Sequence, residues 1–162
     1  MQDAEKLPLV PAQLAALLQP ASLRLDLRAR EKIPALRELV TALQNHPSLP
    51  RSEAFFRELL ARERVTNTAL GNGIALPHAR SDLCDDIVLA VGRSTLGVDY
   101  DAPDGQPVRL LFMVGTPQRQ LTLYHQLIVG LARMLNRPGN RERLLAATDP
   151  ADFIRIMAGL RC

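Results

Sequence analysis

The sequence predicts a single domain of the α/β or mixed α+β class, in which helices cover a central β-sheet. Two observations lead to this class. Segments with the alternation or continuous apolar character of strands are interleaved with segments of helical spacing. A chain of 162 residues buries roughly 70% of its unfolded surface, enough for one core, and no repeat or long linker divides it. We expect residues 1–10 to be an N-terminal tail and residues 11–162 to be the folded domain.

The first part of the chain predicts one strand among helices. Residues 11–19 form a short apolar helix that Pro20 ends. Residues 22–27 alternate between apolar and polar side chains, which is typical of a half-buried strand. A long helix follows over residues 29–45, and Ser52 is expected to cap another that ends near residues 62–64. The predicted buried residues of these two helices are Ile33, Leu36, Leu39, Val40 and Leu43, then Phe55, Phe56, Leu59 and Leu60.

Two continuous apolar runs later in the chain predict further strands. Residues 87–91 and 108–114 have the composition of strands that are covered on both faces. Between them, residues 101–107 form a turn, where Asp104-Gly105 supplies the positive φ that tight turns need. We therefore expect both runs to belong to the central sheet.

The C-terminal part of the chain predicts three helices. Residues 124–135 have helical spacing, and a short helix follows a break at residues 136–140. Asp149 is expected to cap the last helix, with Pro150 in its first turn. The residues that this helix is expected to bury are Phe153, Ile154 and Met157.

Composition and charge exclude several classes. The formal net charge is +3 and the pI is about 9.3, but the cations are scattered among acids, so nucleic acid is not an expected partner. No apolar run approaches the roughly 20 residues of a membrane span, and the N-terminus does not fit a secretory signal. We therefore expect a cytoplasmic protein without membrane insertion. The three histidines and two cysteines lack metal-ligand spacing, so we expect no metal site and no cofactor.

The stretch TNTALGNGIALPHAR, residues 66–80, concentrates the candidate chemistry. Its Gly71-Asn72-Gly73 segment allows three interpretations. A dinucleotide-binding fingerprint needs a helix directly after the glycines, whereas apolar residues here run on to Pro77. A P-loop needs a lysine followed by serine or threonine, which is absent. The remaining interpretation is a tight Asn-Gly turn, then a strand over residues 74–76 that places His78 at its end.

His78 is the candidate reactive residue. A neutral imidazole is nucleophilic near pH 7 because its unperturbed pKa is about 6.5, so it can accept a phosphoryl group without a separate base. It then needs groups that hold the phosphoryl oxygens. Backbone N–H groups of the glycine-rich turn and a nearby arginine are suited to this role. The alternative is an ordinary surface or core histidine.

The segment TALGNGIALPHA, residues 68–79, resembles the active-site motif of the type-2 EIIA domains of the bacterial phosphotransferase system. These are the fructose/mannitol type, and they include free-standing nitrogen-regulatory EIIA proteins. The resemblance extends from about Leu14 over nearly the whole chain, and it includes the segments LLARERV, DGQPV and LARML. It implies a central mixed sheet of about five strands, flanked by helices on both faces.

The resemblance also implies a function, that of a phosphotransferase component which carries a phosphoryl group. The histidine that matches His78 takes the group from a phosphohistidine carrier protein of the HPr type. It passes the group to an EIIB partner or uses it as a regulatory signal. Arg62 matches the family's arginine near the active site, and its alternative is a solvated cation at a helix end. The candidate phosphate-binding residues are Thr68, Gly71, Asn72 and Gly73.

One position departs from the family pattern. The family's second histidine falls at Tyr124 by an ungapped count back from Leu131, and His125 lies one residue later. One residue turns a helical side chain by about 100°, so His125 replaces it only if the loop or the first turn is rearranged. Tyr124 and His125 are therefore both candidates for the residue that assists His78. Tyr124 can donate its hydroxyl to phosphate, or it can pack at the helix start with His125 in solvent. The alternative function is therefore a regulatory protein-binding module with this fold and weakened or lost phosphotransfer.

Overall fold

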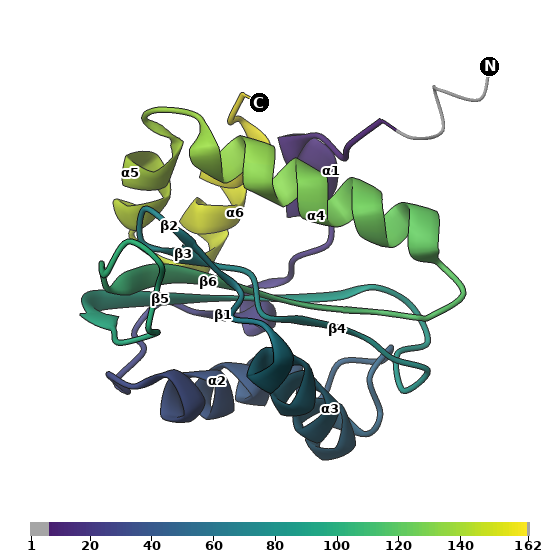
Figure 1. Ribbon diagram of the computed structural model, residues 1–162. Coiled ribbons are helices and arrows are strands. Elements are labelled where there is room, and N and C mark those ends of the chain that lie inside the picture. The colour runs from purple at the N-terminus through teal and green to yellow at the C-terminus, as the bar shows by residue number, and fades with distance from the viewer. Residues whose placement is uncertain (1–6, 162) are drawn as a thin grey trace. The chain divides into compact units, whose positions relative to one another are not determined.

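The computed structural model describes residues 7–161, and Figure 1 labels the elements in chain order. The contacts within the chain group these residues into two compact units. The sheet unit is Ala21–Gln118, and the helical unit consists of residues 7–20 and 119–161. No helix among the described residues is long and apolar enough to span a lipid bilayer.

One mixed sheet of six strands forms the sheet unit, so the predicted fold class is confirmed with one strand more than expected. The strand order is β1-β5-β6-β3-β2, and β4 pairs with β6 further along the same edge. β5 and β6 are antiparallel, whereas β3 and β4 run parallel to β6. The strands are β1 (Leu23–Arg24), β2 (Ala69–Gly71), β3 (Ile74–Ala75), β4 (His78–Arg80), β5 (Val88–Val98) and β6 (Val108–Thr116).

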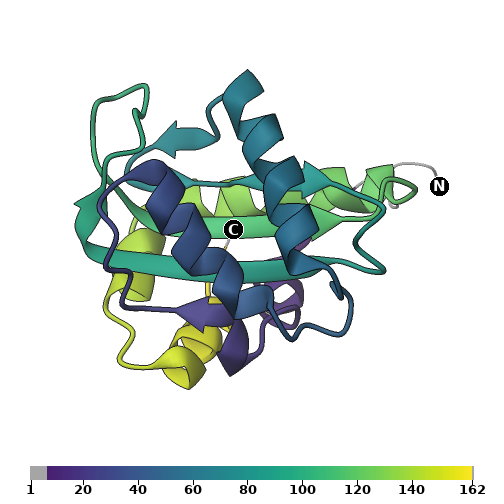
Figure 2. The ribbon, with the colours of Figure 1, turned by 90° about the horizontal axis from the view of Figure 1, so that it is seen from below.

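Two helices cover one face of this sheet, as Figures 1 and 2 show. α2 (Lys32–Val40) continues into a 3₁₀ turn (Thr41–Leu43), and α3 (Ser52–Val65) packs against β4. The apolar positions that helical spacing selected are almost all in the core of this unit. Full burial of such a side chain contributes roughly 1.5–3 kcal/mol. Apolar packing therefore fixes α3 beside the strand that begins with His78.

A two-residue hairpin loop joins β2 to β3 and confirms the predicted Asn-Gly turn. Asn72 and Gly73 have φ values of 56° and 78°. Such left-handed values at both loop residues are typical of a type I′ turn, which Asn-Gly favours. Next to the turn, β3 joins β6 with Ile74 opposite Leu110, and the Gly73 carbonyl accepts the N–H groups of Arg109 and Leu110 at 2.8 and 3.0 Å. From there the chain continues through Leu76 and Pro77 to β4.

The helical unit contains α1 (Pro11–Ala15), α4 (Leu121–Asn136), α5 (Asn140–Leu145) and α6 (Pro150–Ala158). A short 3₁₀ turn (Pro20–Ser22) follows α1, and α1 packs against both α4 and α6. The predicted cap of α6 is confirmed, since the Asp149 carboxylate accepts the Asp152 N–H at 2.8 Å. Phe153 and Met157 are fully buried as expected, whereas Ile154 is only partly buried.

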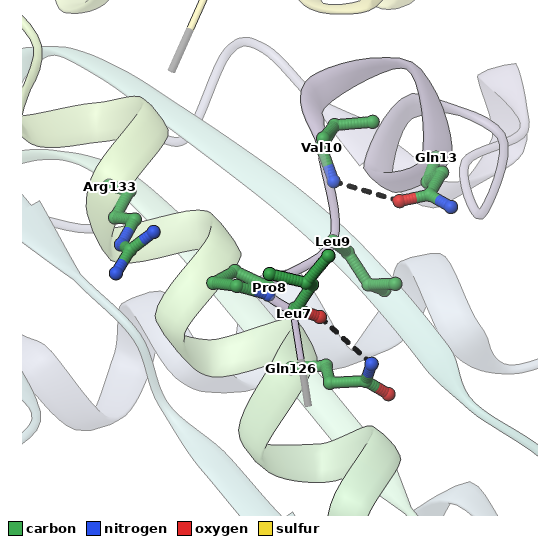
Figure 3. Close-up of a pocket in the computed structure, with 7 residues that line it drawn as sticks. All are labelled: Leu7, Pro8, Leu9, Val10, Gln13, Gln126 and Arg133. Atoms are coloured by element: carbon green, nitrogen blue, oxygen red, sulfur yellow. Dashed lines mark hydrogen bonds between the residues drawn. The ribbon is translucent and has the colours of Figure 1, made fainter. Parts of the chain in front are cut away.

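The N-terminal segment Leu7–Val10 crosses α4 (Figure 3). The side-chain amide of Gln126 donates to the Leu7 carbonyl at 2.8 Å, and the Leu9 N–H donates to the Gln126 carbonyl at 3.0 Å. The crossing is close because Gly130 lacks a side chain: a Cβ there would lie 2.3 Å from the Leu9 carbonyl oxygen. The segment and α4 enclose a surface pocket of about 470 Å³, lined by Leu7, Pro8, Leu9, Val10, Gln13, Gln126 and Arg133.

Several predicted boundaries were wrong, and side-chain hydrogen bonds explain the clearest case. The helix expected over residues 29–45 begins only at Lys32, and the Glu38 carboxylate accepts the N–H groups of Arg28 and Ala29 at 2.9–3.0 Å. These bonds hold the preceding residues outside the helix. Ile33 therefore lies in the first turn with 45% of its surface exposed, instead of in the buried stripe.

The strands differ from their predictions in length. The strand expected over residues 22–27 is paired only at Leu23–Arg24, whereas β5 extends seven residues past the predicted end at Val91. The apolar pattern of a sequence reflects burial rather than backbone pairing. The polar residues in the second half of β5 therefore gave no sign that the strand continues. Ser52 begins α3, but no side chain caps that helix. Cys84 is a buried free thiol, and Cys162 lies outside the described residues.

Candidate functional site

Backbone hydrogen bonds on two sides hold the chain that leads to His78. The Leu76 N–H donates to the Thr68 carbonyl at 3.0 Å, and the Val114 N–H donates to the Pro77 carbonyl at 2.9 Å. His78 then pairs with Val114 as the first residue of β4. The sequence placed this histidine at the end of a strand, whereas it begins a short one. The approach to the ring is nevertheless extended and fixed, as Pro77 demands of its neighbour.

One hydrogen bond defines which nitrogen of His78 carries the proton. The ring nitrogen Nδ1 lies 2.6 Å from the Leu76 carbonyl oxygen. A carbonyl oxygen only accepts, so Nδ1–H is the donor. In the neutral ring the lone pair therefore lies on Nε2. This nitrogen is the one that can attack an electrophile, and its partner bond also fixes the orientation of the imidazole.

The environment of His78 favours the neutral, nucleophilic ring. Burial lowers the pKa of His78 below its ordinary value, and the positive charge of Arg62 lowers it further. The hydrogen bond to Leu76 and the carboxylate of Glu63 act in the opposite direction, and the net shift is downward. Arg62 lies in the last turn of α3, partly exposed. Its charge thus reaches the imidazole, and its contact with phosphate stays a prediction.

Thr68 lies in a buried hydrogen-bond network beneath this turn of α3. Its N–H and its hydroxyl donate to the two carboxylate oxygens of Glu63, at 3.0 and 2.7 Å. The hydroxyl is also 3.0 Å from the Tyr100 hydroxyl, and Lys32 Nζ pairs with Glu63 at 2.8 Å. Both donors that Thr68 was expected to offer to phosphate are therefore already used. Thr68 thus joins α3 to the residues before β2, and its contact with phosphate stays a prediction.

The glycine turn lies too far from His78 to contact a group on the ring. Ile74 pairs with Leu110 and His78 pairs with Val114, so four residues of β6, roughly 13 Å at the strand rise, separate the two points. The Asn72 N–H also donates to the Asp104 carboxylate at 2.8 Å. A phosphate beside that carboxylate would be repelled. The phosphate-binding role expected of this segment, which comprises Gly71, Asn72 and Gly73, stays a prediction that this geometry does not favour.

Tyr124 and His125 lie near the start of α4 and belong to the helical unit. Tyr124 is partly buried and His125 is exposed. Their rings are tilted against each other, with centroids 5.3 Å apart. This contact orients the phenol and the imidazole together at the helix start. The role of Tyr124 in the position of the family's second histidine stays a prediction.

Sequence reasoning did not find three members of the network, Lys32, Glu63 and Tyr100. A signal existed for Glu63, which follows Phe56 and Leu59 at helical spacing and so falls on the buried stripe of α3. Tyr100 and Lys32 have no comparable local signal, because their contacts join distant segments. Within residues 7–161 no group of three or more His, Cys, Asp or Glu side chains is arranged to hold a metal ion.

Comparison with known proteins gives a consistent family. The model of the family described as "Phosphoenolpyruvate-dependent sugar phosphotransferase system, EIIA 2" matches residues 16–159. The fructose-specific EIIABC component of Bacillus subtilis is 32% identical over 145 residues, covering 90% of this chain and 23% of that protein. A nitrogen regulatory protein of Pseudomonas aeruginosa is 36% identical over 110 residues, covering 68% of this chain and 71% of the relative. The chain thus spans about a quarter of the Bacillus protein.

Solved structures share the fold. Nitrogen regulatory protein IIA-Ntr of Neisseria meningitidis superposes with a TM-score of 0.82 at 28% identity, covering 89% of this chain and 98% of that one. Enzyme IIA mannitol of Escherichia coli, solved in complex with phosphorylated enzyme IIB mannitol, has a TM-score of 0.75 at 23% identity, covering 88% and 97%. The chain therefore belongs to the EIIA 2 family of the phosphoenolpyruvate-dependent sugar phosphotransferase system.

Proposed function

We propose that this chain is a phosphoryl carrier that accepts a phosphoryl group on Nε2 of His78. The donor is a phosphohistidine carrier protein of the HPr type, and the acceptor is an EIIB protein or a regulatory target. The observation that carries the proposal is the hydrogen bond from Nδ1–H to the Leu76 carbonyl, which leaves the lone pair on Nε2. Family membership supports the reaction class, and the Escherichia coli complex supports EIIB as an acceptor.

The transfer requires little from the protein beyond position and charge. The Nε2 lone pair of His78 attacks phosphorus, the new N–P bond forms, and the N–P bond of the donor breaks with its electron pair returning to the donor's imidazole. No proton has to move, because Nδ1 keeps its proton on the Leu76 carbonyl. Arg62 supplies positive charge to the phosphoryl oxygens. Phosphoryl transfer of this kind depends on positioning and on electrostatic stabilisation of the oxygens.

The second candidate is a regulatory protein-binding module that has the same fold and weakened or lost transfer. The observation that favours it is Tyr124, which stands where the family pattern has a second histidine. Relatives of both kinds, a fructose-specific component and nitrogen regulatory proteins, match this chain. The two candidates differ in whether His78 becomes phosphorylated.

The deciding experiment incubates the protein with a phosphorylated HPr-type carrier and measures intact mass. We expect the gain of one phosphoryl group, which acid removes, in the wild type and in His46→Ala. We expect no gain in His78→Ala. His46 is the matched control because it is another partly buried histidine of the sheet unit. A wild type that gains no mass, or a His78→Ala variant that gains as much, would refute the carrier proposal.

The same preparations test the module. If the wild type gains no mass, and if the wild type and His78→Ala bind the EIIB protein or regulatory target equally well, the regulatory module is the correct function. If phosphorylated wild type instead loses its phosphoryl group when an EIIB protein is added, the carrier function extends to that acceptor.

A further inference from the structure

A buried carboxylate lies directly beside the proposed site. The side chain of Glu63, in the last turn of α3, is only 3% exposed and pairs with Lys32 of α2 at 2.8 Å. Its two oxygens also accept the N–H and the hydroxyl of Thr68, at 3.0 and 2.7 Å. A buried carboxylate is tolerated only when it is paired and fully hydrogen-bonded. Glu63 meets that condition and thus ties α2, α3 and the start of the hairpin together.

A continuous path of hydrogen bonds leads from Glu63 to the His78 ring. Thr68, held by Glu63, accepts the Leu76 N–H on its carbonyl at 3.0 Å. Leu76 in turn accepts the Nδ1–H of His78 at 2.6 Å. The acceptor that fixes the tautomer of His78 is therefore itself positioned through Thr68. Each link joins a backbone group, so a displacement of Thr68 would move the carbonyl that orients the ring.

Glu63 is also the chain neighbour of Arg62. Consecutive side chains of a helix diverge by about 100°, so the carboxylate of Glu63 enters the core while Arg62 stays partly exposed. The charges of both residues reach the His78 imidazole and act on its pKa in opposite directions. Lys32 balances the Glu63 carboxylate. Because Glu63 is paired with Lys32, the guanidinium of Arg62 remains available for a phosphoryl group.

We propose that Glu63 is a positioning residue. Its hydrogen bonds tie the last turn of α3 to Thr68 and thereby fix the position of Arg62 relative to the His78 ring. Tyr100 stabilises this connection, since its hydroxyl lies 3.0 Å from the Thr68 hydroxyl and its ring centroid lies 4.7 Å from Lys32 Nζ. This role rests on the proposed phosphoryl transfer at His78. Glu63 itself touches no reacting atom.

The test measures how strongly Arg62 acts on His78, by NMR titration of the His78 ring in the unphosphorylated protein. Arg62→Gln removes a positive charge and is expected to raise the pKa of His78. In a Glu63→Gln background, the last turn of α3 is no longer held to Thr68. There, Arg62→Gln is expected to raise the pKa of His78 by less than half of the increase that it causes in the wild-type background. The matched control background is Glu53→Gln on the same helix, whose carboxylate is exposed and pairs with Arg37 at 2.9 Å. There the full effect of Arg62→Gln should persist.

The rate of phosphorylation by an HPr-type donor provides the second readout. Glu63→Gln is expected to slow it by about tenfold or more, since small misplacements of a reacting group have effects of that size or larger, and Glu53→Gln should leave it unchanged. An undiminished Arg62 effect in the Glu63→Gln background overturns the proposal. If Glu63→Gln does not fold, Thr68→Val replaces it, because that change removes one of the two Thr68 donors. The titration needs no donor, so it decides the positioning role even if the wild type proves not to be phosphorylated.

Discussion

At the scale of single residues, one backbone carbonyl and partial burial set the tautomer and the pKa of His78. The Leu76 carbonyl holds the proton on Nδ1, while burial and Arg62 keep the ring neutral by lowering its pKa. A lone pair on Nε2 is thus present near pH 7 without a second base. In the proposed phosphoryl transfer, this lone pair is the nucleophile.

Tyr124 provides a test at the same scale. If its hydroxyl donates to the phosphoryl oxygens, Tyr124→Phe removes one hydrogen bond to a charged group, which is worth roughly 1.5–3 kcal/mol. We therefore expect Tyr124→Phe to slow phosphorylation of His78 by about tenfold or more. Tyr124→His is expected to be phosphorylated at least as fast as the wild type. The measurement is the initial rate with an HPr-type donor.

The control for this test is His125→Ala, which removes the exposed ring beside Tyr124. It should leave the rate near that of the wild type. Equal rates for Tyr124→Phe and the wild type would contradict a role for the phenol and would identify Tyr124 as a packing residue.

Residue types, spacing and the family resemblance predict roles for His78 and Arg62, but they do not predict which neighbours contact these residues. Thr68 and the glycine turn were expected to bind phosphate because amides and hydroxyls suit that task. The structure gives the donors of Thr68 to Glu63 and the Asn72 amide to Asp104. Those competing acceptors come from residues 5 and 32 positions away, and a local motif carries no information about partners at such distances.

At the scale of elements, the turn signal and one of the two predicted caps were correct, whereas the Ser52 cap and the start of α2 were not. The Asn-Gly hairpin and the Asp149 cap depend on local backbone chemistry, and both formed as predicted. The late start of α2 depends on Glu38, whose carboxylate binds the backbone of Arg28 and Ala29. Such a long-range side-chain contact overrides local helix propensity.

The crossing of the N-terminal segment over α4 gives a prediction for an element. Gly130→Ala improves helix propensity by about 1 kcal/mol, yet its Cβ would lie 2.3 Å from the Leu9 carbonyl oxygen. We therefore expect α4 to remain and the segment Leu7–Val10 to separate from it. Hydrogen exchange of the Leu9 N–H, which now donates to Gln126, should accelerate about tenfold or more as this local contact opens.

Val129→Ala is the matched control for the crossing, because Val129 is the exposed neighbour of Gly130 on α4. It should leave the exchange of the Leu9 N–H unchanged. If Gly130→Ala preserves the protection of that N–H, the close approach does not depend on the glycine.

At the scale of the whole molecule, the interleaving of strand and helix patterns was sufficient to predict the fold class. Every residue of Val88–Val91 is buried, and so is every residue of Val108–Val114 except Arg109, as their apolar composition predicts. The pairing of β4 with β6 could not be foreseen, because three residues headed by His78 have no strand periodicity of their own. Their pairing continues the edge of β6 that β3 begins, with Ile74 opposite Leu110 and His78 opposite Val114.

The free energy of unfolding should fall as the pH decreases below about 6.5, the ordinary histidine pKa. Burial lowers the pKa of both His46 and His78 in the folded protein. His46 Nδ1 also accepts the Ser48 N–H at 3.1 Å, a bond that protonation would remove. The unfolded chain then binds more protons than the folded one, so stability is complete above that pH and is lost as the pH falls through the folded-state values.

Urea unfolding between about pH 5 and 7.5 measures this loss before carboxylates titrate, since their ordinary pKa values lie near 4. The double variant His46→Gln/His78→Gln should have a flatter dependence of the unfolding free energy on pH than the wild type. His125→Gln, on the exposed side of α4, is the control and should keep the wild-type slope. A double variant that keeps the full slope would show that other groups cause the loss, and would remove the support that burial gives to a neutral His78.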